Sequence, residues 1–176
     1  TSKLLPNYGY PVGLDIVDRA AKIPAWLGRA ARGYYSKFYL DLAIESTDKK
    51  TISSALKMLQ GQHRNAVLSL ADDRFLYPVI ERLGIPFGAV LSSEQARCYK
   101  PRPELFHNLL KRLDVTPREA VYVGDRQYED VQGARKAGTR AIWLNRDGVA
   151  LDPNLPEPDH QIESLLAIPG LVNHQE

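Results

Sequence analysis

The sequence predicts an α/β protein, with a parallel sheet preceded by an α-helical region. From Arg64 onward, short apolar runs typical of buried strands alternate with amphipathic stretches typical of helices, and this alternation indicates βαβ units. Before residue 50, Pro6, Pro11 and Pro24 punctuate the chain, and in the segment 34–42 aromatic and leucine residues recur every four positions, as on a helix.

The first βαβ unit follows Arg64 directly. The apolar run Ala66–Leu70 predicts a strand, and the segment Arg74–Leu83 carries its apolar residues at helical spacing. Gly84 is expected to end this helix, because glycine readily adopts the left-handed backbone of a helix C-terminus. The run Gly88–Leu91 predicts the second strand.

Two further strands follow, with helices before and between them. Pro103 predicts the start of a helix whose leucine and phenylalanine residues form one apolar face as far as Leu113. The runs Ala120–Val123 and Ala141–Leu144 predict strands, and a helix over Tyr128–Ala137 is expected to connect them.

The flanks of this pattern are less regular. A helix over Asp48–Leu59 is expected before the first strand. Three prolines predict an irregular loop over Ala150–Asp159, and the segment Ser164–Val172 predicts a closing helix that is interrupted near Pro169.

Composition and charge narrow the classes of function. The 176 residues are 44% hydrophobic and 25% charged, with a net charge of +2, which is too weakly basic to indicate a nucleic-acid or membrane partner. A small molecule is the expected partner. Cys98 is the only cysteine, so no internal disulfide forms and a reducing compartment is expected, either the cytoplasm or an organelle, with the cytoplasm as the leading expectation. The first residue is Thr1 and the only methionine is Met58, so we expect a natural start upstream.

Three polar residues follow predicted strands, namely Ser69, Lys100 and Asp125. Because ligands bind where the carboxyl ends of parallel strands meet, we expect these residues to converge at that edge. Ser69 offers a hydroxyl, and Lys100 offers a point positive charge to a carboxylate or phosphate. Asp125, with Glu129 and Asp130 at the following turn, offers the carboxylate oxygens that suit Mg²⁺.

Each of these residues also has an ordinary structural role. A serine at a strand end usually caps a helix or forms a turn, a loop lysine is usually solvated, and carboxylates are favoured in the first turn of a helix. Only the joint order and spacing of the residues favour a functional site.

The order and spacing resemble a known family. The run Tyr99–Phe106, which contains Lys100, and the run Val123–Ala134, which contains Asp125 and Asp130, resemble the third and fourth motifs of the haloacid dehalogenase (HAD) superfamily. The resemblance implies a Rossmann-like core with a helical cap, dependence on Mg²⁺ and, most often, hydrolysis of phosphate esters.

The resemblance covers most of the chain, roughly residues 51–172. Ser69 resembles the second motif, although Leu70 stands where the family often has asparagine. The implied domains are a partial helical cap over 1–50 and a Rossmann-like core over 51–176.

The family's first motif is not found in the sequence. That motif is a strand ending in Asp-x-Asp, in which the first aspartate attacks the substrate and the second acts as acid and base. The segment Asp15–Asp18 has the wrong spacing, and Phe38–Ala43 has the apolar run and Asp41 but lacks the second aspartate. We therefore expect the nucleophile strand upstream of Thr1.

In the family's fold the nucleophile strand is central, between the strand of Ser69 and the strand of Asp125. Two strands that face a gap leave backbone groups unpaired, at a cost of about 1–3 kcal/mol for each group. We expect a second chain, an upstream segment or a rearranged Phe38–Ile44 to fill the gap.

The leading hypothesis is a HAD-type phosphatase that acts on a small phosphorylated metabolite. Ser69, Lys100 and Asp125 would form the catalytic site, Ser69 and Lys100 would bind the substrate, and Asp125 and Asp130 would hold Mg²⁺. An upstream aspartate would be the nucleophile. Whether Glu129 joins the metal site stays open.

Other classes of function remain as alternatives. A 2-haloacid dehalogenase is disfavoured because it needs no metal, whereas three neighbouring carboxylates concentrate negative charge that a cation would balance. A HAD-like binding or assembly module that has lost the nucleophile motif is the main rival. No Gly-x-Gly-x-x-Gly follows any predicted strand, which argues against a dinucleotide-binding protein.

Overall fold

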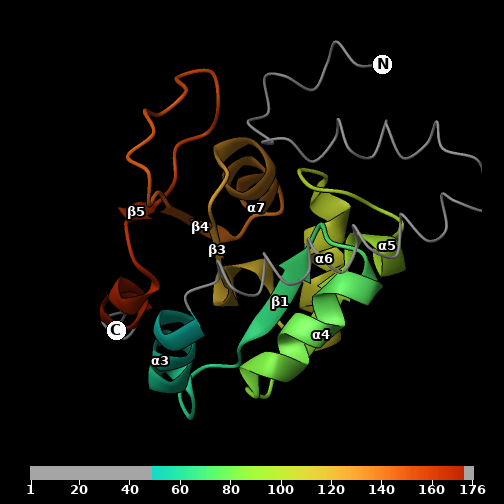
Figure 1. Cartoon of the computed structure of the whole chain (residues 1–176). Coiled ribbons are helices and arrows are strands. Elements are labelled where there is room, and N and C mark those ends of the chain that lie inside the picture. The colour runs from blue at the N-terminus through green and yellow to red at the C-terminus, as the bar shows by residue number, and fades with distance from the viewer. Residues whose placement is uncertain (1–48, 173–176) are drawn as a thin grey trace, which may run out of the picture. The chain divides into compact units, whose positions relative to one another are not determined.

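A computed structural model of the chain describes residues 49–172 (Figure 1). These residues lie within one compact unit, Asp48–Glu176. They form the expected α/β fold, with five strands arranged in two parallel sheets. The predicted helix at 34–42 and the alternative nucleophile Asp41 lie outside the described residues.

The first sheet is the pair β1 (Ala66–Ser69) and β2 (Ala89–Ser92), connected by helix α4 (Asp73–Leu83). The two strands are parallel, and their last residues lie opposite each other. Helix α4 ends at Gly84 as predicted, because the φ angle of 63° there is left-handed backbone that favours glycine.

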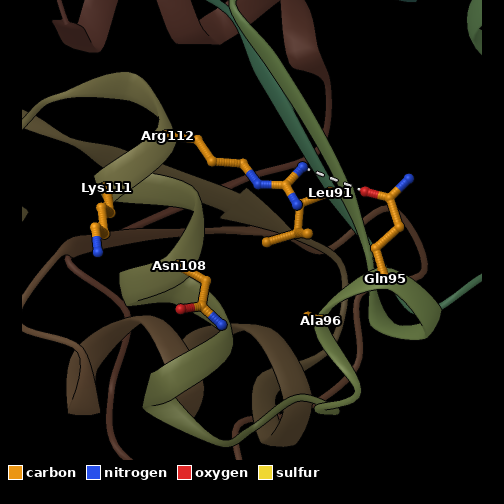
Figure 2. A pocket seen from close by; sticks show the side chains of 6 residues that line it. All are labelled: Leu91, Gln95, Ala96, Asn108, Lys111 and Arg112. Atoms are coloured by element: carbon orange, nitrogen blue, oxygen red, sulfur yellow. Dashed lines mark hydrogen bonds between the residues drawn. The ribbon is translucent and has the colours of Figure 1, made fainter.

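A side chain covers part of the outer edge of β2. Arg112 of helix α6 (Pro103–Leu113) donates a hydrogen bond to the backbone oxygen of Val90 at 3.1 Å. It donates another to Oε1 of Gln95 at 3.2 Å (Figure 2). Charged side chains at an edge strand oppose pairing with other chains. An open pocket of about 440 Å³ lies here, lined by Leu91, Gln95, Ala96, Asn108, Lys111 and Arg112.

The second sheet has the order β3-β4-β5. Strands β3 (Val121–Gly124) and β4 (Arg140–Leu144) confirm the predicted runs. The sequence does not predict β5 (His160–Ile162), because this strand is three residues long and its first two residues are exposed.

The segment between β3 and β4 differs from the single helix that its apolar spacing predicts. It begins with a π-helical turn, η3 (Gln127–Val131), and continues as helix α7 (Gln132–Lys136). In this turn the N–H of Val131 donates to the oxygen of Arg126, five residues earlier, at 3.2 Å. Such turns occur mostly as single insertions in helices and are frequent at functional sites.

The remaining helices lie at the ends and in the connections. Helix α3 (Lys49–Leu59) confirms the helix expected before β1. After β5, the chain forms the short helices η4 and α8, so the predicted closing helix is interrupted near Pro169, between Ala167 and Ile168. Pro169 itself lies in the first turn of α8, where proline is tolerated. The bounds not yet given are α5 (Ser93–Ala96), η2 (Pro117–Glu119), η4 (Leu165–Ala167) and α8 (Ile168–Val172). No described helix combines the length and the apolar character needed to cross a bilayer.

One apolar cluster packs both sheets against the same helices. It joins Leu68 and Leu91 of the first sheet to Ala141 and Trp143 of the second, together with buried residues of α6 and α7. Helices α6 and α7 therefore form a layer that the two sheets share.

A second cluster lies on the other face of β4. Ile142 and Leu144 alternate with the residues of the first cluster, so they face the opposite side of the strand. They pack with Leu59 of α3, Ile162 of β5 and Ile168 of α8.

No backbone ladder joins the two sheets within the described residues. Strand β1 pairs with β2, and β3 pairs with β4, so each has an edge without a partner strand among residues 49–172. A side chain crosses between them instead, since the hydroxyl of Tyr122 on β3 lies 3.5 Å from the backbone oxygen of Leu68 on β1.

Candidate functional site

The candidate site is built on the carboxyl ends of the strands. Ser69 ends β1, and Asp125 follows Gly124 at the end of β3. Lys100 lies between β2 and α6, and Pro103 then opens that helix. The elements thus place the three predicted residues at the sheet edge where open α/β folds bind ligands.

The centre of the site is a buried ion pair between Lys100 and Asp130. The Lys100 Nζ atom lies 2.5 Å from Oδ1 of Asp130, and only 9% and 4% of the two side chains are exposed. Lys100 also donates to the Tyr122 hydroxyl at 2.9 Å. Lys100 is therefore buried and paired, unlike a typical loop lysine, which is solvated.

The environment keeps this lysine charged. Burial alone would lower the pKa of the Lys100 ammonium, but the neighbouring oxygens of Tyr122 and Asp130 outweigh that effect and raise the pKa above its usual value. Burial likewise raises the pKa of the Tyr122 phenol, so the phenol is neutral and keeps its proton near neutral pH.

Asp130 is fixed by its backbone surroundings as well. Its Oδ2 atom accepts a hydrogen bond from the N–H of Arg126 at 3.0 Å, and its own N–H donates to the oxygen of Arg126 at 2.9 Å. The carboxylate packs on Gly124, where an added Cβ would lie 2.3 Å from Cγ of Asp130. Only glycine leaves room for this carboxylate at the end of β3.

Asp125 has the opposite environment. It is exposed, and no hydrogen bond or ion pair is found between its carboxylate and another described residue. Its backbone is held in place, because the indole Nε1 of the buried Trp143 donates to the oxygen of Asp125 at 3.0 Å. This leaves a solvent-accessible carboxylate on a fixed backbone.

Ser69 lies in a tight turn. Its hydroxyl oxygen accepts from the N–H of Ala71 at 3.1 Å, and its backbone oxygen accepts from the hydroxyl of Ser93 at 3.3 Å. The first contact is the turn role expected of a serine at a strand end. The hydroxyl proton of Ser69 has no acceptor among the described residues, so it is available to a ligand.

Tyr122 brings the parts of the site together. Its hydroxyl contacts Lys100, Asp130 and the backbone of Leu68, the residue before Ser69. The structure therefore brings Lys100, Asp130 and the backbone of Leu68 together at one phenol, which the sequence analysis did not single out. The available signal is a tyrosine in an otherwise aliphatic strand, because a buried phenol usually finds a hydrogen-bond partner.

A second polar network at the end of β2 was also not predicted. Asp73 accepts from the hydroxyl of Ser92 at 2.5 Å and from Nε2 of Gln95 at 3.1 Å, while its N–H donates to Glu94 at 2.8 Å. These bonds fix the start of α4 to the end of β2. None of these bonds involves Lys100 or Asp130.

Mg²⁺ fits this site with one direct carboxylate. Among residues 49–172, no three His, Cys, Asp or Glu side chains lie close enough to enclose a metal, but Mg²⁺ usually takes only one or two carboxylates plus water and phosphate oxygens. The accessible carboxylate of Asp125 meets that need, whereas both oxygens of Asp130 already accept hydrogen bonds. Glu129 is buried, with 9% of its surface exposed.

Comparison with known proteins supports the resemblance. A family model described as haloacid dehalogenase-like hydrolase matches residues 25–144. Haloacid dehalogenase-like hydrolase domain-containing protein 3 of Danio rerio is 31% identical over 192 residues, which cover 98% of this chain and 76% of that protein.

Two phosphatases match over smaller shares of their length. Glyceraldehyde 3-phosphate phosphatase of Pyrococcus furiosus is 26% identical over 149 residues, 81% of this chain and 61% of that protein. Phosphoserine phosphatase of Thermus thermophilus is 43% identical over 81 residues, 45% of this chain and 31% of that protein. The chain thus spans less than two thirds of both phosphatases.

Solved structures share the fold. A 2-haloacid dehalogenase of Pseudomonas syringae superposes with a TM-score of 0.68 at 27% identity, over 88% of this chain and 66% of that one. A HAD phosphatase of Thermococcus onnurineus superposes with a TM-score of 0.61 at 27% identity, over 69% of this chain and 56% of that one. Sequence, fold and motifs agree, and this chain belongs to the haloacid dehalogenase-like hydrolase family.

Proposed function

We propose that this chain is the core of a Mg²⁺-dependent phosphatase that acts on a small phosphorylated metabolite in the cytoplasm. One observation carries the proposal. At the carboxyl edge of the strands, the buried ammonium of Lys100 is paired with Asp130. The same carboxylate accepts from the backbone of Arg126, in the loop that presents the exposed carboxylate of Asp125. A dianionic phosphate needs both a fixed cation and a carboxylate-held metal ion.

Lys100 would bind the phosphoryl group. Its ammonium has three hydrogens, of which two are directed at Oδ1 of Asp130 and at the hydroxyl of Tyr122. The third has no acceptor among the described residues. A phosphate oxygen would complete the shell of this ammonium, and Ser69 would donate its hydroxyl proton to another phosphate oxygen.

Asp125 and Asp130 would hold Mg²⁺, with Asp125 as the direct ligand. Asp130 would act mainly through its negative charge and through its hold on Lys100, because its oxygens already accept protons from Lys100, Tyr122 and the Arg126 backbone. When bound, the ion would neutralise charge on the phosphate oxygens.

The nucleophile would be an aspartate on a strand between β1 and β3, on residues upstream of Thr1. The topology supports this position, because β1 and β3 each have an edge without a partner strand among residues 49–172. A strand paired with both would satisfy the backbone groups along these edges. Its carboxyl end would lie beside those of β1 and β3, at the site.

We further propose a cap over residues 1–50 and a core over 51–176. The compact unit Asp48–Glu176 supports the position of this boundary. The partner would be a small phosphate ester, with neither nucleic acid nor membrane as a partner.

The test is Mg²⁺-dependent release of phosphate from an aryl phosphate, by the natural full-length protein and by this chain. We expect Asp125→Asn to lower the rate at least a hundredfold, while Lys111→Gln, on the exposed face of α6, leaves it unchanged. An inactive but folded full-length protein would contradict the proposal and favour the non-catalytic module. Activity of this chain alone would place the nucleophile within it, with Asp41 as the first candidate.

A dehalogenase is the second candidate, favoured by the fold shared with the 2-haloacid dehalogenase of Pseudomonas syringae. The two activities separate in one experiment, because halide release from a 2-haloacid would persist in EDTA, whereas phosphate release would stop. Halide release that is unaffected by EDTA, without any phosphatase activity, would decide for the dehalogenase.

A further inference from the structure

Tyr122 contacts both Lys100 and Asp130, and the proposed function assigns it no role of its own. It lies on β3, and its ring meets that of Phe106 on α6 edge to face, with centroids 4.9 Å apart and planes at 69°. Both residues belong to, or pack against, the cluster shared by the two sheets. This packing holds the Tyr122 ring, and its hydroxyl lies within hydrogen-bond distance of both Lys100 and Asp130.

The hydroxyl proton of Tyr122 has two candidate acceptors and can serve only one. Oδ1 of Asp130 lies 3.1 Å away and carries negative charge, while the backbone oxygen of Leu68 lies 3.5 Å away. The shorter contact to a charged acceptor is the stronger bond. The hydroxyl thus donates to Asp130 and accepts from Lys100.

These bonds form a closed triangle. Lys100 donates to Asp130 at 2.5 Å and to Tyr122 at 2.9 Å, and Tyr122 donates to Asp130. One acceptor would leave the ammonium free to rotate about that contact, whereas two acceptors fix all three N–H directions. The third N–H then points in one direction, away from the triangle.

We propose that Tyr122 is a positioning residue that directs the free N–H of Lys100 toward the transferred phosphoryl group. This inference rests on the proposed phosphatase function. Tyr122 does not contact the substrate in this account. It acts through Lys100, and its loss leaves the charge of the ion pair intact while removing the second acceptor.

The decisive variant is Tyr122→Phe, with Tyr77→Phe as its matched control, in the natural full-length protein. Tyr77 also carries a hydroxyl in a hydrogen bond, with Gln95 at 2.6 Å, but at an exposed position outside the triangle. We expect Tyr122→Phe to lower kcat about tenfold and to change KM less than twofold, because orientation of a charged donor matters most in the transition state. Tyr77→Phe should match the wild type.

A second readout does not depend on catalysis. The Lys100 ammonium is buried and donates two hydrogen bonds, so it should give a slowly exchanging Nζ–H signal in ¹⁵N-edited NMR. This signal should disappear in Tyr122→Phe and remain in Tyr77→Phe. A folded Tyr122→Phe protein that keeps both the wild-type kcat and the signal would overturn the inference. If the wild type has no phosphatase activity, the proposed function fails, and the NMR signal still decides whether Tyr122 fixes Lys100.

A second variant covers the case in which Tyr122→Phe does not fold. Phe106→Leu keeps every polar group of the triangle and removes the edge contact that holds the ring. We expect a twofold to threefold fall in kcat and faster exchange of the Lys100 signal. An unchanged kcat together with an unchanged signal would count against the inference.

Discussion

Two ion pairs of similar length show how burial decides what a charge does. The Lys100 and Asp130 pair joins atoms 2.5 Å apart with 9% and 4% of the side chains exposed, and the Arg135 and Asp159 pair joins atoms 2.6 Å apart with 43% and 29% exposed. Water screens the second pair but not the first. The second pair fixes the end of a loop, whereas the first holds a cation where a ligand can use it.

The largest effect is expected from Lys100→Met. This change leaves the Asp130 carboxylate buried without its cation, so the free energy of unfolding should fall by about 3–5 kcal/mol. Denaturation by urea measures it, with Arg135→Met as the matched control, for which we expect about 0.2–1 kcal/mol. An equal loss of unfolding free energy in the two variants would show that burial does not decide how much each ion pair contributes to stability.

Gly124→Ala should disturb the buried ion pair by displacing the Asp130 side chain. The new Cβ would lie 2.3 Å from Cγ of Asp130, so the carboxylate must move away from Lys100, at a cost of about 1–3 kcal/mol. The control is Gly170→Ala in α8, where an added Cβ meets nothing within 4 Å and helix propensity improves. Thermal unfolding should show a lower Tm for the first variant only.

Asp159→Asn should have a smaller, pH-dependent effect. Partial burial would raise the pKa of the Asp159 carboxyl, but the Ala141 amide and the Arg135 guanidinium outweigh it and lower the pKa. The stabilisation is therefore present above the unfolded pKa of about 3.9 and is lost as the pH falls through the folded pKa. At pH 7 we expect a loss of about 1 kcal/mol. Urea unfolding should show that the difference in free energy of unfolding between the wild type and Asp159→Asn is smaller at pH 3 than at pH 7. An equal difference at both pH values would contradict this explanation.

Asp125→Asn should leave the free energy of unfolding within about 0.5 kcal/mol of the wild type, because its carboxylate is exposed and bonded to no described residue. Urea unfolding checks this. A large loss of stability would mean that Asp125 has a structural role and would remove the main reason to regard it as a ligand.

The local elements of the fold are predictable from the sequence because they depend on local patterns. Apolar runs mark β1 and β4, and apolar residues at helical spacing mark α6. The sequence of β5 has no such pattern. This segment forms a strand because it pairs with the backbone of β4. The π-helical turn at Gln127–Val131 depends on hydrogen bonds to Arg126 that no apolar period encodes.

The candidate site is predictable in its members but not in its connections. The family motifs point to Lys100, Asp125 and Asp130, while the roles of Tyr122 and Trp143 depend on contacts across 22 and 18 residues. A strand pattern gives these aromatic residues only a packing role. Their polar atoms find hydrogen-bond partners only when the strands are assembled, so the sequence alone did not reveal these roles.

The central claim is that the edge formed by β1 and β3 binds a divalent cation and phosphate together. The most direct test follows Mn²⁺, in place of Mg²⁺, by electron paramagnetic resonance while inorganic phosphate is added to the natural full-length protein. We predict that phosphate tightens Mn²⁺ binding and that Asp125→Asn weakens it at least tenfold. Wild-type Mn²⁺ affinity in Asp125→Asn, or an affinity that phosphate does not change, would contradict the claim.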